Sequence, residues 1–322
     1  MAPTIQEGRL NLLQLDKGGN VGSIDKGMQI HDEIVNKRFL EKDIVLGTTL
    51  VDMYAKCGAL VKARQVFDEL SDRNIVSWSV IISGYTQHGH GEEALKCFEQ
   101  MQREGLTPNA IIFTCILKAC GITKDIDKGI EIHEQIVGKG WLGKDIMLSN
   151  ALADMYVKCD KLTKAQKVLC ELPERDVVSW SILIAGLTQH GQAEETLYSF
   201  EQMQREGISP NPVTFACILK ACGSVGDIKK GKEIHDEIVK RGLMENDVVL
   251  GTALVDMYAK FGDLTKAHEL LENMPVRNVV SWSALITGYS QQGQSEEALK
   301  CFDKMQHEGL YPNVITLSCI LK

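Results

Sequence analysis

The sequence predicts an all-α fold, an α-solenoid superhelix built from helix-turn-helix repeats. Trp78, Trp180 and Trp282 stand 102 residues apart, and several other residues recur with the same spacing. Each block of 102 residues divides into three related repeats of two short amphipathic segments, and no segment alternates as a strand would. A hairpin of this size cannot bury its apolar face alone, so successive hairpins must stack against one another.

Nine full repeats and a truncated tenth account for residues 8–322, after a lead-in at residues 1–7. The repeats are 35, 36 or 31 residues long, and one copy of each length makes up a block. In chain order they are 8–43, 44–74, 75–109, 110–145, 146–176, 177–211, 212–247, 248–278, 279–313 and the partial 314–322. The chain stops after the first helix of the tenth repeat, so we expect this end to fray or to associate with another copy.

The repeat 75–109 illustrates the two helices expected in each repeat. Its first apolar residues recur at helical spacing until a glycine-rich turn interrupts them. Glu92 and Glu93 then open a second helix, where negative charge is favourable. Gly105 is placed to cap the end of that helix, and Pro108 prevents its continuation. We expect the first helices of successive repeats to line one surface, which would form a ligand groove.

The composition limits the classes of function. The net charge is −8, whereas a protein that held nucleic acid by bulk electrostatics would be basic. Nucleic-acid binding would therefore depend on locally placed cations and on base contacts. The ten cysteines include no Cys-x-x-Cys pair and are expected to be small core residues in a reducing compartment. No apolar run is long enough to span a membrane. The N-terminus resembles neither a secretory signal nor a transit peptide, so either a targeting segment has been removed or the chain is cytosolic.

No catalytic or metal-binding arrangement emerges from the sequence. The segments 31–33 and 235–237 match the His-x-Glu half of a zinc deaminase, but the Pro-Cys-x-x-Cys half is missing. Residues 226–232 resemble a phosphate-binding P-loop, but Glu233 replaces the Ser or Thr that would bind magnesium, and no strand precedes it. We therefore expect no enzymatic activity, no catalytic residue, no metal and no cofactor.

The repeats resemble pentatricopeptide repeats. The resemblance is carried by Val279-Val-Ser-Trp-Ser-Ala-Leu-Ile-Thr-Gly-Tyr, Glu296-Glu-Ala-Leu-Lys-Cys-Phe-Asp-Lys-Met, Ile116-Leu-Lys-Ala-Cys-Gly and Leu254-Val-Asp-Met-Tyr-Ala-Lys. The three alternating lengths resemble the PLS subclass of land plants, and the resemblance covers residues 8–322. It implies binding of single-stranded RNA, one base per repeat, running 5′ to 3′ along the chain. It also implies a place in mitochondria or chloroplasts, where such proteins commonly select cytidines for RNA editing.

The resemblance assigns base recognition to the fifth and last residues of each repeat. The pairs are Thr48/Asn74, Ser79/Asn109, Thr114/Asp145, Asn150/Asp176, Ser181/Asn211, Thr252/Asn278 and Ser283/Asn313. An Asn amide can donate to the bare ring nitrogen of A or C, whereas Asp can only accept, which suits the ring N–H of U or G. In the family, a small hydroxyl at the fifth position favours a purine and Asn a pyrimidine. The expected site is 5′-NAA(G)UANAA-3′, because Leu12 and Ala216 leave two fifth positions without a polar group.

The resemblance assigns two further classes of contact. The apolar second residues of the repeats would sandwich the bases, and these are Val45, Val76, Ile111, Met147, Val178, Val213, Val249 and Val280. The thirteenth residues of the 31-residue repeats would contact phosphates, and these are Lys56, Lys158 and Lys260. The chain lacks the C-terminal deaminase domain of many relatives, so a role in editing would need a deaminase partner in trans.

Plainer interpretations of the same residues stay open. A Ser or Thr at position five can be a polar residue early in a helix, and the terminal Asn residues can be helix N-caps or loop residues. The three lysines can be solvated charges near a turn. The recurrent tryptophans and histidines are expected to pack in the core rather than to bind bases or metal. The alternative function is a protein-binding scaffold like the tetratricopeptide repeats, which uniform 34-residue repeats would have favoured.

Overall fold

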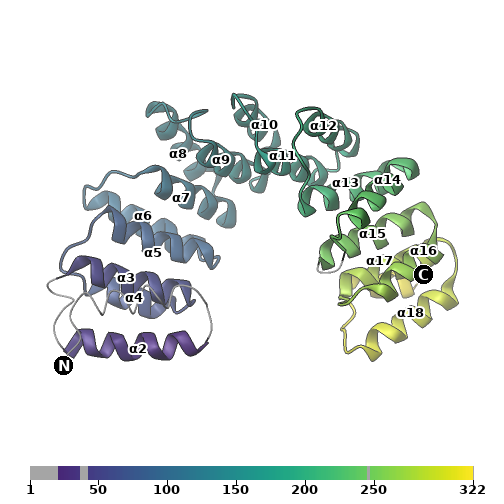
Figure 1. Cartoon of the computed structure of the whole chain (residues 1–322), viewed down its shortest axis with the longest axis horizontal. Coiled ribbons are helices and arrows are strands. Elements are labelled where there is room, and N and C mark those ends of the chain that lie inside the picture. Colours follow the sequence, from purple (N-terminus) through teal and green to yellow (C-terminus); the bar gives the residue numbers. More distant parts are fainter. Residues whose placement is uncertain (1–20, 37–42, 245–246, 322) are drawn as a thin grey trace. The chain divides into compact units, whose positions relative to one another are not determined.

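The computed structural model describes residues 21–36, 43–244 and 247–321. The predicted lead-in 1–7, most of the first helix of repeat 8–43 with Leu12, and the terminal Lys322 lie outside these residues. Over the described residues every regular element is an α-helix, which confirms the predicted all-α solenoid (Figure 1). Each of these helices is too short or too polar to cross a membrane.

The chain divides into two compact halves, Met1–Pro173 and Glu174–Lys322. The helices of the N-terminal half are α2 (Val21–Asn36), α3 (Ile44–Lys56), α4 (Leu60–Asp68), α5 (Ile75–Gln87), α6 (Gly91–Arg103), α7 (Ala110–Thr123), α8 (Ile126–Gly138), α9 (Ile146–Lys158) and α10 (Leu162–Cys170). The helices of the C-terminal half are α11 (Val177–Gln189), α12 (Ala193–Arg205), α13 (Pro212–Val225), α14 (Ile228–Lys240), α15 (Val248–Phe261), α16 (Leu264–Asn273), α17 (Val279–Gln291), α18 (Ser295–His307) and α19 (Val314–Ile320).

Each complete repeat from residue 44 to residue 313 contains one helical hairpin (Figure 1). Within each half, a first helix packs against its own second helix and against the first helix of the next repeat, as α5 does with α6 and α7. The second helices pack against the following first helix, as α6 does with α7. The first helices thus form one continuous layer in each half, and the second helices cover its outer side.

The second helix of the repeat 75–109 ends at the predicted glycine. Glu104 is the C-cap of α6, and Gly105 follows with φ of +79°, a conformation that glycine adopts without steric cost. Leu106 N–H donates to Met101 O, and Gly105 N–H donates to Gln102 O. These two bonds form a Schellman motif, which satisfies carbonyl groups at the helix end. The helix begins at Gly91, one residue before the predicted Glu92, because His90 is its N-cap residue.

The three recurrent tryptophans are buried, as predicted. Trp78 is fully buried, and its indole Nε1–H donates to Glu104 Oε2 over 3.0 Å. Arg73 Nη1, from the end of the preceding repeat, lies 3.3 Å from Glu104 Oε1. The same Trp–Glu–Arg arrangement recurs around Trp180, with Glu206 and Arg175, and around Trp282, with Glu308 and Arg277. Each arrangement joins the two helices of a 35-residue repeat to the loop before them.

The recurrent histidines also pack against neighbouring repeats. The Nδ1 atom of His133 on α8 lies 2.7 Å from the hydroxyl of Tyr156 on α9. The equivalent pairs His31–Tyr54 and His235–Tyr258 have distances of 3.0 and 2.9 Å. Burial lowers the pKa of the three histidines and raises the pKa of Tyr156 to about 12. The recurrence of His is therefore explained by a hydrogen bond between successive repeats.

Candidate nucleic-acid interface

The first helices of the C-terminal half line a groove of about 770 Å³. Five successive first helices contribute to it: α11, α13, α15, α17 and the start of α19. Residues from all three predicted classes of contact lie in its wall, namely Thr252, Asn278 and Ser283, Val249 and Val280, and Lys260. The groove therefore brings together side chains that are far apart in the sequence but equivalent in the repeats.

The last residue of every complete repeat is the N-cap of the next first helix. These N-caps are Asp43, Asn74, Asn109, Asp145, Asp176, Asn211, Asp247, Asn278 and Asn313. In Asn109, for example, Oδ1 accepts the backbone N–H of Ile112 over 2.9 Å. The N-cap interpretation of these residues is thus confirmed. The cap uses one of the two terminal atoms of the side-chain amide or carboxylate, and the other terminal atom is its second branch.

The capping bond determines which atom occupies that second branch. A backbone N–H can only donate, so the capping atom must be an oxygen. In Asn the other branch is then the amide nitrogen, a donor, whereas in Asp it is the second carboxylate oxygen, an acceptor. The same cap geometry thus presents opposite hydrogen-bonding character in Asn109 and in Asp176, whose Oδ1 accepts from Ser179 N–H over 2.8 Å.

The structure brings the fifth and last residues together in two repeats of the C-terminal half. Asn211 Nδ2 donates to Ser181 Oγ over 3.0 Å, and Ser283 Oγ lies 3.5 Å from Asn313 Oδ1. The Ser181 hydroxyl in turn donates to Val177 O over 2.6 Å, so it meets the amide as an acceptor. These contacts support the pairing of positions five and last, and they hold the Asn side chain in place.

The remaining fifth residues differ in how their polar groups are used. The hydroxyls of Thr48, Ser79 and Thr114 donate to the carbonyl four residues earlier, over 2.7, 2.7 and 2.9 Å. Asn150 is 5% exposed. Thr252 differs, because its Oγ1 atom is buried and has no hydrogen-bond partner among the described residues. Thr252 itself is part of the wall of the groove.

The predicted base-sandwiching residues are exposed although they are apolar. The exposed fractions of the eight side chains run from 47% at Val178 to 71% at Met147. Single exposed apolar residues are ordinary, but here the same repeat position is exposed each time, while the residue just before it is half-buried. Ile315, the second residue of the tenth repeat, extends the series: it is 59% exposed and lines the groove. Ile315 was not among the predicted residues, although the repeat register already indicated it.

The three predicted phosphate-contacting lysines are already paired with carboxylates. Lys56, Lys158 and Lys260 lie 2.9, 2.8 and 2.7 Å from the aspartate four residues earlier in the same helix. These aspartates are Asp52, Asp154 and Asp256. Side chains four apart face each other on a helix, so this pairing was visible in the Asp-x-x-x-Lys spacing. Each pair has no net charge, which weakens its attraction for a phosphate.

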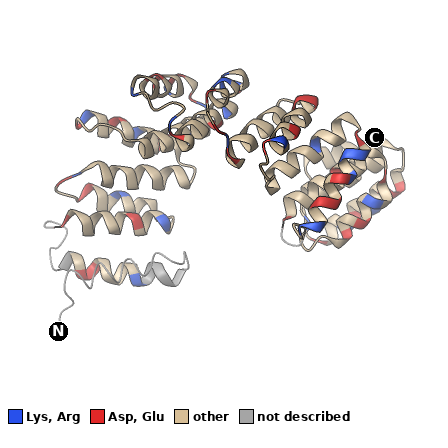
Figure 2. Cartoon of the chain, turned by 45° about the horizontal axis from the view of Figure 1, so that its top comes forward, with Lys and Arg blue, Asp and Glu red and all other residues tan. Residues whose placement is uncertain are grey.

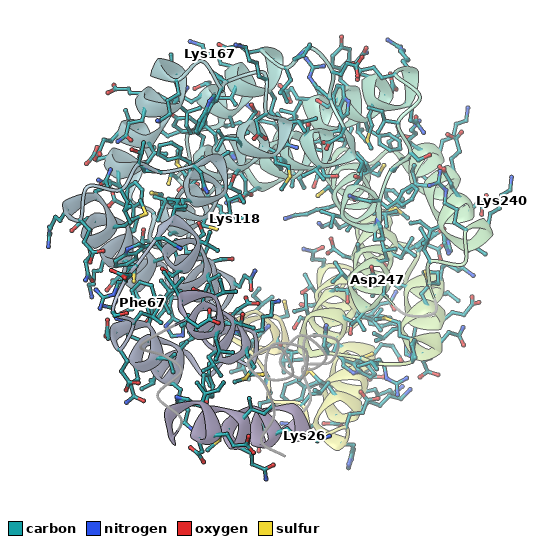
Figure 3. The ribbon with its side chains drawn as sticks, turned by 60° about the vertical axis from the view of Figure 1, so that its left-hand side comes forward. Lys26, Phe67, Lys118, Lys167, Lys240 and Asp247 are labelled. Carbon is teal, nitrogen blue, oxygen red and sulfur yellow. The ribbon has the colours of Figure 1, made fainter. Side chains whose placement is uncertain are left out.

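Two further lysines, which are not among the predicted contacts, lie on the same layer of first helices. Lys220 on α13 is exposed and lines the groove. Lys118 on α7 occupies the equivalent position in the N-terminal half and is exposed on the side of the first helices, opposite Lys167 of α10 (Figure 3). Within the described ranges, neither lysine has a carboxylate oxygen within 4.0 Å. The repeat register could have identified both, because they are 102 residues apart.

Burial keeps several of the cysteine thiols protonated. It raises the pKa of Cys120 to about 12 and the pKa values of Cys222 and Cys301 to about 11. A protonated thiol is a poor nucleophile and a poor metal ligand. The described residues contain no group of three or more His, Cys, Asp or Glu side chains placed to hold a metal ion.

The comparisons with known proteins identify the repeats. A model of the PPR repeat family matches residues 73–122, 175–224 and 277–322, and a PPR repeat model matches residues 48–75, 148–177, 213–243 and 252–279. Together these matches cover more than half of the chain. The chain belongs to the pentatricopeptide repeat family.

Relatives of this pentatricopeptide repeat protein include two from Arabidopsis thaliana. A chloroplastic pentatricopeptide repeat-containing protein is 40% identical over 283 residues, which are 88% of this chain and 45% of the relative. A mitochondrial one is 36% identical over 301 residues, which are 94% of this chain and 54% of the relative. The chain thus spans about half the length of these relatives.

Solved structures of another pentatricopeptide repeat protein share the fold. PPR10 in complex with an 18-nt psaJ RNA element matches with a TM-score of 0.80 and 18% identity, over 99% of this chain and 47% of that one. PPR10 from maize matches with a TM-score of 0.74, again at 18% identity, over 99% of this chain and 46% of that one. At this level of identity the likeness shows the solenoid fold alone.

Proposed function

We propose that this pentatricopeptide repeat protein binds single-stranded RNA along the layer of its first helices, one base per repeat. The observation that carries the proposal is the groove of the C-terminal half, whose wall holds Thr252, Asn278, Val249 and Val280 together. Two exposed apolar side chains from successive repeats offer a slot for the flat face of a base. The residues at positions five and last, in turn, offer polar groups at its edge. Membership of a family with an RNA-bound member supports the same ligand.

The hydrogen-bonding character of the N-caps gives the proposed base order. Asn at the last position leaves an amide donor beside the base, which matches the bare N1 of adenine. The carboxylate of Asp176 can offer only acceptors, which match the ring N–H of uracil when Asn150 is its partner. The proposed site is 5′-NAA(G)UANAA-3′, with the 36-residue repeats contributing the positions marked N or in parentheses.

The proposed cellular role is site recognition in organellar RNA processing. The alternation of 35-, 36- and 31-residue repeats supports the PLS subclass, whose members commonly direct C-to-U editing. One of the two Arabidopsis relatives is chloroplastic and the other is mitochondrial, which supports a place in an organelle. We propose that the chain itself binds without catalysing a reaction and that a deaminase acting on the bound RNA comes from elsewhere.

The test is a titration of the chain against three labelled RNAs. The first contains the proposed site, the second contains the same bases in permuted order, and the third is a base-paired version of the first. We expect binding of the first RNA, with each unmatched base costing about 1–3 kcal/mol in the second, and weak binding of the third. Equal affinity for the first two would contradict recognition base by base. A chain that bound none of them but captured a protein ligand would support the scaffold function instead.

A further inference from the structure

The layer of first helices carries few charges, and most of them cancel. From α3 to α19 the first helices contain five lysines and three aspartates. Figure 2 shows most of the charged residues on the second helices and the loops. The three aspartates pair with Lys56, Lys158 and Lys260. Among the charged residues within these helices, Lys118 and Lys220 are the two that have no such partner in the described part of the chain. Four further aspartates cap the starts of first helices: Asp43, Asp145, Asp176 and Asp247.

The sequence explains why these two lysines are unpaired. Each is the ninth residue of a 36-residue repeat, and a carboxylate partner on the same helix would have to stand three or four residues away. The residues four positions earlier are Thr114 and Ala216, and those three positions later are Gly121 and Gly223. None of these can neutralise an ammonium group. The 31-residue repeats differ, because an aspartate stands four residues before their lysine.

Each unpaired lysine lies close to a paired one on the next first helix. Gly223 stands one helical turn after Lys220, and a Cβ atom added to Gly223 would come within 3.1 Å of the side-chain Cδ of Lys260. Gly121 likewise stands one turn after Lys118, and a Cβ atom added to Gly121 would come within 2.9 Å of Lys158 Cδ. Around these lysines the junction between a 36-residue and a 31-residue repeat thus holds two ammonium groups and one carboxylate. This part of each junction has a net positive charge, whereas the cap carboxylates of Asp145 and Asp247 lie at the opposite ends of α9 and α15.

The surroundings of Lys220 suit a sugar–phosphate backbone better than a base edge. The fifth residue of its repeat is Ala216, which lines the groove beside Cys217 and offers no polar group. We propose that Lys118 and Lys220 bind phosphodiester groups of a bound single strand and that backbone contact is the main contribution of the 36-residue repeats. This inference rests on the proposed RNA function and adds a ligand contact to the repeats that contribute the positions marked N or in parentheses.

The test compares the salt dependence of RNA binding in matched variants. Lys118→Ala and Lys220→Ala remove the proposed contacts. Lys167→Ala and Lys240→Ala remove exposed lysines of second helices, on the opposite side of the same halves (Figure 3). Each contact to a single strand contributes about 0.7 to the slope of log affinity against log salt. When the salt concentration rises fourfold, the fold-loss of affinity should therefore be about 2.6 times smaller for each of the first two variants than for wild type. The second two should behave as wild type.

A second measurement locates the contact and separates it from a general charge effect. The measurement uses a set of RNAs that carry the proposed site, each with one uncharged methylphosphonate linkage at a different position. One of these RNAs should bind wild type more weakly than the unmodified RNA does. The same RNA should bind Lys220→Ala as well as the unmodified RNA does. Lys220→Arg should retain the wild-type response, because a guanidinium also binds phosphate. If wild type distinguishes permuted RNAs while Lys118→Ala and Lys220→Ala keep its salt slope, the phosphate contacts are wrong and the proposed function stands. If wild type binds no RNA, the proposed function fails first.

Discussion

Asn109 caps α7 through its Oδ1 atom, and that bond determines what the rest of its side chain can offer to a base. The acceptor is used by Ile112 N–H, so the amide nitrogen remains for an outside partner. In the equivalent residue Asn211, one amide N–H is already directed to Ser181. Helix capping and base preference therefore depend on the same side chain, and a substitution can change one without the other.

We predict that Asn109→Asp keeps the cap and reverses the base preference. Asn, Asp and Ser are similarly good N-caps, so thermal stability should hardly change. The outward branch becomes an acceptor, so the preference at the third position of the site should shift from A toward G by about 1–3 kcal/mol. Titrations against two RNAs that differ only at this base measure the shift.

Asn109→Ser and Asn109→Ala are the controls for this prediction. Ser should keep the cap but lose discrimination between the two RNAs, because its hydroxyl is too short to reach the base. Ala should lose both and destabilise the helix by about 1 kcal/mol. A loss of affinity in Asn109→Asp that was equal for both RNAs would mean that the residue acts only as a cap.

At the residue scale, the repeat register predicted where the site residues lie but not which groups they bond to. It placed Thr252, Asn278 and Ser283 in one series, and the groove contains all three. It could not show that the hydroxyl of Ser181 is an acceptor for Asn211, because that depends on where the hydroxyl proton goes in the folded helix. The partners of Lys260 were predictable from spacing on one helix, whereas the isolation of Lys220 also depends on what neighbouring helices provide.

At the element scale, a Trp–Glu–Arg contact connects the two helices of each 35-residue repeat. Glu104 at the end of α6 accepts from Trp78 of α5 and pairs with Arg73. Arg73 also donates to the carbonyls of Phe67 and Asp68, at the end of α4. It immediately precedes Asn74, the N-cap of α5. The contact thus lies directly beside Asn74, a proposed base-reading residue, and combines the buried Trp78 with the half-buried Arg73 and the exposed Glu104.

We predict that Glu104→Ala loosens the hairpin formed by α5 and α6. It leaves the buried indole N–H of Trp78 without a partner, which costs about 1–3 kcal/mol. Glu104→Gln should cost less, because an amide oxygen can still accept from the indole. Hydrogen exchange of α5 and α6 measures the change locally, which suits a repeat protein whose unfolding need not be all-or-none.

The matched control for this prediction is Glu99→Ala on the same helix. Glu99 forms an exposed ion pair with Arg103, and such pairs contribute about 0–1 kcal/mol. Equal effects of Glu99→Ala and Glu104→Ala would mean that the indole contact adds nothing beyond a surface charge.

Helix boundaries were predictable from sequence where a residue type is required by geometry. The left-handed position after α6 requires a residue without a steric penalty, and Gly105 supplies it. The start of α6 was less well determined, since no side chain caps it, and the helix extends back to Gly91. The Trp–Glu–Arg contact was not predictable, because it joins three segments whose meeting depends on how successive hairpins stack.

At the scale of the whole molecule, the net charge of −8 opposes the binding of RNA. The first helices contribute little to that charge, because they carry five lysines against three aspartates. The acidic excess lies on other parts of the chain. We therefore expect affinity to depend on base contacts more than on phosphate neutralisation, and the dependence on salt to be shallow.

With Lys118 and Lys220 as the two unpaired cations, we predict a slope of log affinity against log salt of about −1.4. Replacing Asp52, Asp154 and Asp256 with Asn releases three more lysines and should steepen the slope to at most about −3.5. The replacements remove only exposed ion pairs, each worth about 0.3–0.5 kcal/mol, so the fold should persist. Base preference should be unchanged, because phosphates carry no sequence information. A wild-type slope already steeper than about −3.5 would mean that cations outside the first helices bind the RNA.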